Sequence, residues 1–99
     1  MPRIELAPEV LADFDRFIDH LEEHGVDDAQ QRIGAIIEAI DILASSPGVG
    51  RLAKGGLREL VIGRASRGYV ALYRFVPAID TVFVLAVRSQ RESGYERAP

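Results

Sequence analysis

The stretch RGYVALYRFVPAIDTVFVLAVRSQRESGY, from Arg67 to Tyr95, decides the fold of this 99-residue chain. Two segments within it, 69–76 and 81–89, are rich in Val, Leu, Tyr and Phe, and a short turn at 77–80 joins them. Such residues favour β-strands, and so short a connection is typical of a hairpin. The stretch therefore predicts two adjacent antiparallel strands followed by a polar tail.

The pattern continues toward the N-terminus with one more strand and a pair of helices. Residues 57–62 are predicted to form a strand that the turn at 63–68 joins to the next one. Upstream of it, apolar residues recur at helical spacing in two segments that only a few residues separate, which predicts an antiparallel helix hairpin. The two apolar stripes are Val10, Phe14, Phe17, Ile18 and Leu21, then Ile33, Ile36, Ile37, Ile40 and Leu43.

Residues typical of helix ends bound these two helices. Pro8 suits the first position of a helix, and Gly25 can end that helix in a left-handed conformation. Asp27 or Asp28 can cap the second helix, and Pro47 ends it because proline disfavours helix in the preceding residue.

The alternating residues 4–6 add a short first strand. The predicted fold class is α+β with the order β-α-α-β-β-β, in which the helix hairpin packs on one face of a small, mainly antiparallel sheet. The length suits a single domain, 1–99. The first strand can pair with the second or the fourth strand, and the sequence leaves both open.

The composition excludes several classes of protein. There is no cysteine, so neither a disulfide framework nor a thiolate metal site is possible. No segment is as long and apolar as a membrane span, and the first residues do not resemble a signal peptide. We therefore expect a cytoplasmic protein without membrane contact.

The net charge of −3 hides two unlike halves. Residues 1–50 hold three basic and eleven acidic residues, a charge of −8, whereas residues 51–99 hold nine basic and four acidic residues, a charge of +5. Such an asymmetry suggests two surfaces with different partners. The basic half could meet a nucleic acid or an acidic protein.

Arginines inside the predicted strands carry the strongest functional signal. Arginine is rarely buried unpaired, so Arg74 and Arg88 must either be solvated or meet carboxylates. One interpretation is a set of exposed ion pairs, and the other is a cationic binding surface. The six arginines of the three strands and their ends are Arg58, Arg64, Arg67, Arg74, Arg88 and Arg91.

Other motifs do not indicate catalysis or a cofactor. The glycine-rich loop 47–56 fits neither phosphate-binding fingerprint and is interpreted as a flexible connector. His20 and His24 have the spacing of a metal-binding pair but lack a third ligand in the motif. No serine lies in a nucleophile elbow. We expect no cofactor and no metal.

Three segments, GLRELVIG at 56–63, RGYVALYR at 67–74 and VFVLAVRSQRESGY at 82–95, resemble the ParE branch of the RelE/ParE toxin superfamily. These are toxins of type II toxin–antitoxin modules, often labelled plasmid stabilisation proteins. The resemblance implies the β-α-α-β-β-β architecture and a cognate antitoxin whose C-terminal segment wraps the helices and the sheet. A homodimer or a toxin–antitoxin heterotetramer is compatible with that partnership.

The resemblance leaves two activities for such a toxin. ParE-like members inhibit DNA gyrase by protein contact, whereas RelE-like members cleave mRNA on the ribosome. RelE-like nucleases carry an arginine after the GY pair of the third strand, where this chain has Val70, and they are strongly basic overall. We therefore expect a ParE-like gyrase inhibitor. The expected target contacts are Arg74, Arg88, Arg91 and Tyr95, with Arg58, Arg64 and Arg67 as a secondary basic surface.

Two alternatives remain at this point. In a RelE-like, metal-independent endoribonuclease, Arg91 and Tyr95 are the candidate catalytic residues, because such a nuclease needs basic groups and a tyrosine to activate the 2′-hydroxyl and protonate the leaving oxygen. The third possibility is an inactive module that only binds an antitoxin.

Overall fold

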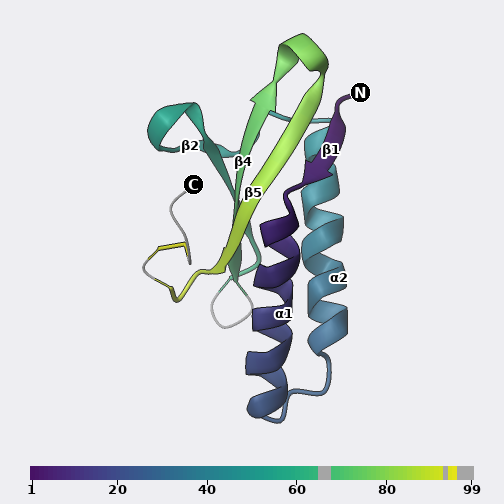
Figure 1. The fold of residues 1–99 in the computed structure, drawn as a ribbon, viewed down its shortest axis with the longest axis vertical. Coiled ribbons are helices and arrows are strands. Elements are labelled where there is room, and N and C mark those ends of the chain that lie inside the picture. Colours follow the sequence, from purple (N-terminus) through teal and green to yellow (C-terminus); the bar gives the residue numbers. More distant parts are fainter. Residues whose placement is uncertain (65–67, 93, 96–99) are drawn as a thin grey trace.

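A computed structural model describes residues 1–64, 68–92 and 94–95. Over these residues the chain forms two α-helices and a five-stranded sheet, with short 3-10 turns between some elements (Figure 1). The expected α+β fold with its order of elements is confirmed. The helices and strands are β1 (Arg3–Leu6), α1 (Pro8–Glu23), α2 (Ala29–Ile40), β2 (Arg51–Leu52), β3 (Arg58–Ile62), β4 (Tyr69–Val76) and β5 (Thr81–Ser89).

The strands lie in the order β1-β5-β4-β3-β2. The three predicted long strands form the antiparallel β3-β4-β5 meander. The first strand, whose partner the sequence left open, pairs with the last: β1 runs parallel to β5, with Arg3 opposite Thr81 and Leu6 opposite Val84. The sheet is thus mainly antiparallel with one parallel pair at its edge.

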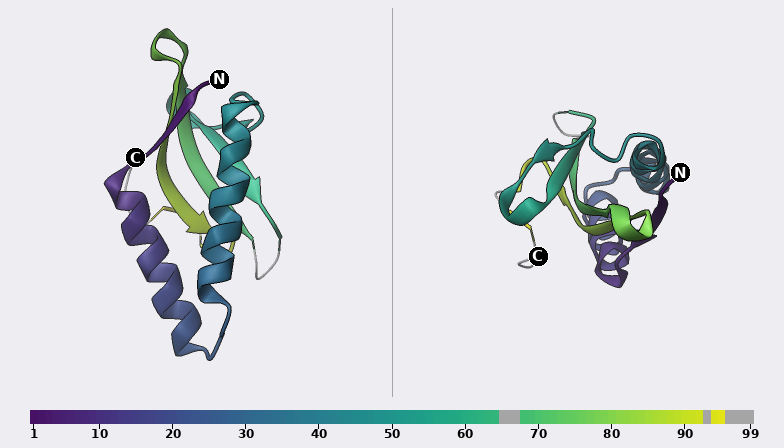
Figure 2. Two further views of the ribbon diagram at one scale, coloured as in Figure 1. Left: turned by 90° about the vertical axis from the view of Figure 1, so that its right-hand side faces the viewer. Right: turned by 90° about the horizontal axis from the view of Figure 1, so that it is seen from above.

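Both helices cover the same face of the sheet (Figure 2). The main core lies between the helices and the sheet, because the apolar stripes of α1 and α2 pack against alternate residues of β4 and β5. Burying each large apolar side chain contributes about 1.5–3 kcal/mol. The buried members are Val10, Phe14, Phe17, Ile33, Ile36, Ile40, Leu43, Tyr69, Ala71, Tyr73, Val82, Val84 and Val87.

A smaller apolar cluster lies on the other face of the sheet. Leu57, Leu72 and Ala86 are its buried members, and the side chain of Tyr95 packs against them. The tail after β5 therefore returns across the face that the helices leave uncovered.

The start of both helices and the end of α1 agree with the sequence prediction, but α2 ends at Ile40 and a 3-10 turn, Asp41–Ala44, follows it before Pro47. Pro8 begins α1, and Gly25 follows its end with a φ of 70°, as a left-handed C-cap requires. Asp28 precedes α2, but its side chain makes no capping hydrogen bond. Its carboxylate instead accepts from Nε of Arg32 at 3.1 Å, one helical turn later.

The glycine-rich loop is more ordered than the predicted flexible connector. It contains strand β2 and is fastened by Tyr73, whose hydroxyl donates to the carbonyl of Pro47 (2.7 Å) and accepts from the amide of Gly50 (2.9 Å). A Cβ atom at position 50 would lie 2.6 Å from that hydroxyl. Glycine is therefore needed at position 50 for this close approach.

The buried carboxylate of Asp13 joins α1 to β5. It is only 2% exposed and accepts from the backbone amide of Val87 at 3.0 Å. The pairing of β1 with β5 extends only to Val84, so Val87 lies on the part of β5 that β1 does not cover. Asp13 thus provides the hydrogen bond that a neighbouring strand would otherwise make.

Neither described helix has the length and the apolar composition that crossing a membrane requires.

Candidate functional site

The strand register places Arg74 and Arg88 on the sheet face away from the helices. Their chain neighbours Tyr73 and Val87 belong to the helix-facing core, and successive side chains of a strand point to opposite faces. Glu59 lies on the same helix-free face, since it pairs with Leu72 of the smaller cluster. This face, with the tail that crosses it, is the candidate target-binding face.

Glu59 is the centre of a polar network on this face. Its carboxylate accepts from the hydroxyl of Tyr95 at 2.5 Å and from Nε of Arg51 at 3.1 Å. The guanidinium carbon of Arg88 lies 5.2 Å from the centre of the Tyr95 ring, within the range of a cation–π interaction. The network holds the tail on the sheet.

Arg88 is half-buried and organises the turn that follows β5. Its Nη1 donates to the carbonyl oxygens of Ser89 (3.2 Å) and Glu92 (3.0 Å). Its Nε is buried and has no hydrogen-bond partner among the residues that the structure describes. Much of this guanidinium is therefore engaged inside the protein, and less of it is available to a partner than an exposed strand arginine would offer.

The network shifts the pKa values of both of its acidic groups. Burial raises the pKa of the Glu59 carboxyl, but the hydrogen bonds from Tyr95 and Arg51 and the charges of Arg51 and Arg88 outweigh burial, so this pKa falls below its usual value. Burial also raises the pKa of the Tyr95 hydroxyl, and the hydrogen bond to anionic Glu59 raises it further. Tyr95 is therefore held as a neutral donor and Glu59 as an anionic acceptor.

Arg74 is the exposed predicted contact residue of this face. Its Nη2 lies 3.4 Å from the carbonyl oxygen of Gly55, which is a weak contact. The charged strand residues of the face are four arginines and two glutamates: Arg3, Arg51, Arg74 and Arg88 against Glu5 and Glu59. The candidate target-binding face therefore carries a positive charge.

The other predicted basic residues lie elsewhere. Arg58 pairs in register with Tyr73, on the helix-facing side, and donates to the carbonyl of Gly50 at 2.8 Å. Arg64 is exposed in the turn after β3, and Arg67 lies outside the described residues. Arg91 lines a cavity beside α1 and is separated from Arg74 by the sheet. Three of the four expected contact residues thus share a face, and Arg91 does not.

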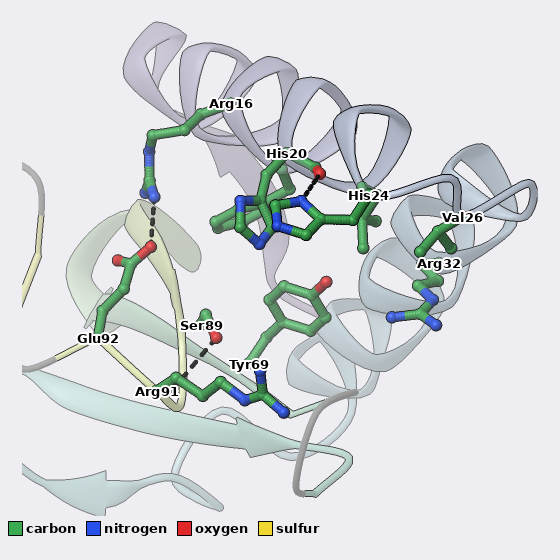
Figure 3. A pocket seen from close by; sticks show the side chains of 11 residues that line it. Arg16, His20, His24, Val26, Arg32, Tyr69, Ser89, Arg91 and Glu92 are labelled. Carbon is green, nitrogen blue, oxygen red and sulfur yellow. Dashed lines mark hydrogen bonds and ion pairs between the residues drawn. The ribbon is translucent and has the colours of Figure 1, made fainter.

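The cavity that includes Arg91 has a volume of about 690 Å³ and lies between α1, the start of α2 and the end of β5 (Figure 3). Arg16 closes one side of it through an ion pair with Glu92, and Arg16 also lies 3.6 Å from Asp13. The residues that line it are Arg16, Phe17, His20, Leu21, His24, Val26, Arg32, Tyr69, Ser89, Arg91 and Glu92.

His20 and His24, which have the spacing of a metal-binding pair, contact each other. Nδ1 of His24 donates to the carbonyl oxygen of His20 at 2.8 Å, and the two ring centres are 4.4 Å apart. Within the described part of the chain, no three His, Asp or Glu side chains gather closely enough to hold a metal ion.

Sequence reasoning misses the acids that organise the site. From the sequence, Glu59 only reduces the positive charge of the arginine-bearing strands. In the structure, its carboxylate accepts a hydrogen bond from Tyr95 and so holds the tail on the sheet. A signal for Asp13 exists, because an aspartate three residues after Val10 stands on the apolar stripe of α1. An acid in such a position indicates a buried hydrogen bond.

Comparisons with known proteins agree with this fold. Residues 4–94 match the family described as "ParE toxin of type II toxin-antitoxin system, parDE". The chain therefore belongs to the ParE toxin family of type II toxin–antitoxin systems.

One solved structure that the fold resembles is that of the "Chromosomal ParDE TA system from P. aeruginosa". Its TM-score is 0.74 at 22% sequence identity, and the match covers 90% of this chain and 96% of the other. No curated protein sequence matches the chain.

Proposed function

We propose that this ParE-family toxin inhibits DNA gyrase by protein contact through its helix-free sheet face, and that a cognate antitoxin neutralises it in the cytoplasm. The observation that carries the proposal is the exposed side chain of Arg74 on the same sheet face as the Tyr95–Glu59–Arg88 network. Arginine and tyrosine side chains dominate the binding energy of many protein interfaces. The contacts of Tyr95 with Glu59 and Arg88 place this aromatic side chain on the positive sheet face.

The geometry favours gyrase contact over the RelE-like nuclease. A general acid works best when its pKa lies near the working pH, but the pKa of Tyr95 is raised away from it. The hydroxyl of Tyr95 is also committed to Glu59. Arg91, the other candidate catalytic residue, lines the cavity on the helix side of the sheet. These different surroundings of Tyr95 and Arg91 support gyrase contact rather than joint catalysis by the two residues.

An antitoxin has a suitable surface on the helices. The outward side chains of Leu11 (59% exposed) and Ile37 (40% exposed) are apolar and lie on the acidic half of the chain. Apolar contacts here would leave the cationic sheet face to the target or to a second segment of the antitoxin. A toxin–antitoxin heterotetramer, or a homodimer of the free toxin, fits this division of surfaces.

The test is inhibition of gyrase supercoiling by the purified protein. The wild type is expected to inhibit, and Arg74→Glu is expected to weaken inhibition at least about tenfold by reversing a charge in the interface. Arg91→Glu is the matched control, because Arg91 is also an exposed arginine but lines the cavity on the helix side of the sheet. Absence of inhibition by the wild type at a large molar excess over gyrase would contradict the proposal.

A further inference from the structure

Tyr69 differs from Tyr73 and Tyr95 in the hydrogen bonding of its hydroxyl group. The hydroxyls of Tyr73 and Tyr95 each have a hydrogen-bond partner. Tyr69 is only 6% exposed, and its hydroxyl has no hydrogen-bond partner among the residues that the structure describes. It points into the 690 Å³ cavity (Figure 3). This hydroxyl keeps contact with solvent in the cavity, so it is free to donate to a bound ligand.

Two arginines line the same cavity as this hydroxyl. The side chain of Arg91 makes no hydrogen bond or ion pair with any residue in the described ranges, and it extends below the Tyr69 ring (Figure 3). Arg32 uses Nε to bind Asp28, and its terminal nitrogens remain on the cavity side (Figure 3). A cavity that holds two guanidinium groups and a phenolic donor is suited to an oxyanion, because charge-assisted hydrogen bonds are the strong ones.

The remaining wall of the cavity suits a flat apolar body. Phe17 and Tyr69 pack with ring centres 5.0 Å apart, and Leu21 continues this apolar floor. The rings of His20 and His24 also line the cavity and lie above the Tyr69 ring in Figure 3. The volume of about 690 Å³ falls within the range of small-molecule sites, roughly 300–1,000 Å³.

We propose that this cavity binds a small planar anion of the nucleoside monophosphate class. The phosphate meets the hydroxyl of Tyr69 and the guanidinium groups of Arg91 and Arg32, and the ring packs against the aromatic wall. The site lies on the helix side of the sheet, opposite Arg74. Ligand binding there is therefore independent of the proposed gyrase contact.

The experiment titrates the full-length chain, labelled with ¹⁵N, with adenosine and uridine monophosphates, with inorganic phosphate and with a peptide of alternating Glu and Leu. Nucleoside monophosphates are expected to shift the amide signals of Ser89 and Arg91. Tyr69→Phe keeps the ring and removes only the hydroxyl, so it should weaken binding about five- to tenfold. Arg91→Gln should weaken binding at least about tenfold, whereas Arg3→Gln should leave it unchanged.

Four results would overturn the proposal: no nucleotide binding at millimolar concentration, equal binding of inorganic phosphate, binding of the acidic peptide alone, or undiminished nucleotide binding by Tyr69→Phe. The last result is interpretable only for a folded variant. The dispersion of the amide spectrum reports folding directly, and Arg91→Gln, which alters an exposed residue, gives the same test without changing the core.

Discussion

The hydroxyl of Tyr95 donates a 2.5 Å hydrogen bond to the carboxylate of Glu59, a residue 36 positions earlier in the chain. This contact joins the tail after β5 to the middle of β3. It fixes the tail over the smaller apolar cluster and beside Arg88. The shape of the candidate target-binding face therefore depends on one bond between distant parts of the sequence.

Tyr95→Phe is expected to lower the free energy of unfolding by about 1–2 kcal/mol, because it removes a hydrogen bond to a charged group and retains the ring. Urea unfolding measures this loss. Glu59→Gln and the double variant complete a cycle, in which the double variant should lose less than the sum of the single losses. Strict additivity would show that the two residues do not interact in solution.

Acid should destabilise the protein through Glu59. Its pKa is lowered in the folded state from the usual 4.5, so its contribution is present above about pH 4.5 and is lost as the pH falls through the lowered value. Glu59→Gln should therefore flatten the decline of unfolding free energy in acid. An unchanged pH profile of this variant between neutral and acidic pH would contradict the assigned shift.

Alkali should act on the same bond through Tyr95. The pKa of its hydroxyl is raised above the usual 10.0, so its contribution is complete below pH 10 and declines as the pH rises toward the folded value. Absorbance titration should show a tyrosine step later than that of free tyrosine, and Tyr95→Phe should remove this late step. Persistence of the late step in Tyr95→Phe would contradict the assigned shift.

Asp13→Ala is expected to destabilise the fold by about 2–4 kcal/mol, since it leaves the buried amide of Val87 without an acceptor and weakens the hold on Arg16. Hydrogen exchange at the Val87 amide should accelerate more than at other core amides of β5. Asp15→Ala, an exposed change on the same helix, serves as the control and should have little effect. Equal losses for both variants would refute the special role of Asp13.

Gly50→Ala is expected to cost about 1–3 kcal/mol, because the added Cβ would lie 2.6 Å from the Tyr73 hydroxyl and 2.8 Å from the carbonyl oxygen of Glu59. Gly48→Ala is the matched control, since a Cβ at position 48 meets nothing within 4 Å. Thermal unfolding of the two variants measures the difference. Similar melting temperatures for both would show that the loop is not held against Tyr73.

Local pattern predicted most of the fold. Segments 69–76 and 81–89 formed strands with the predicted ends, because both are rich in β-branched and aromatic residues and are bounded by turn residues. The partner of β1 could not be predicted, because both edges of the meander offered unpaired backbone groups. Strand β2 was missed since two residues give no periodicity.

The site was less accessible to sequence reasoning. The charge pattern indicated an arginine-bearing sheet face, and the register places Arg74 and Arg88 together there. Nothing local indicated that the tail would fold back so that Arg88 lies against the ring of Tyr95. Likewise, the helical and strand patterns place Tyr69 in the core but do not reveal that its hydroxyl points into a cavity. Such contacts depend on tertiary structure.

The most direct test of the proposed target-binding face compares the affinity of gyrase for two charge reversals on opposite sides of the sheet. Arg74→Glu should weaken binding at least about tenfold, whereas Arg91→Glu, on the cavity side, should stay within about twofold of the wild type. Calorimetry or surface binding with purified gyrase measures both. A larger loss for Arg91→Glu than for Arg74→Glu would contradict the account.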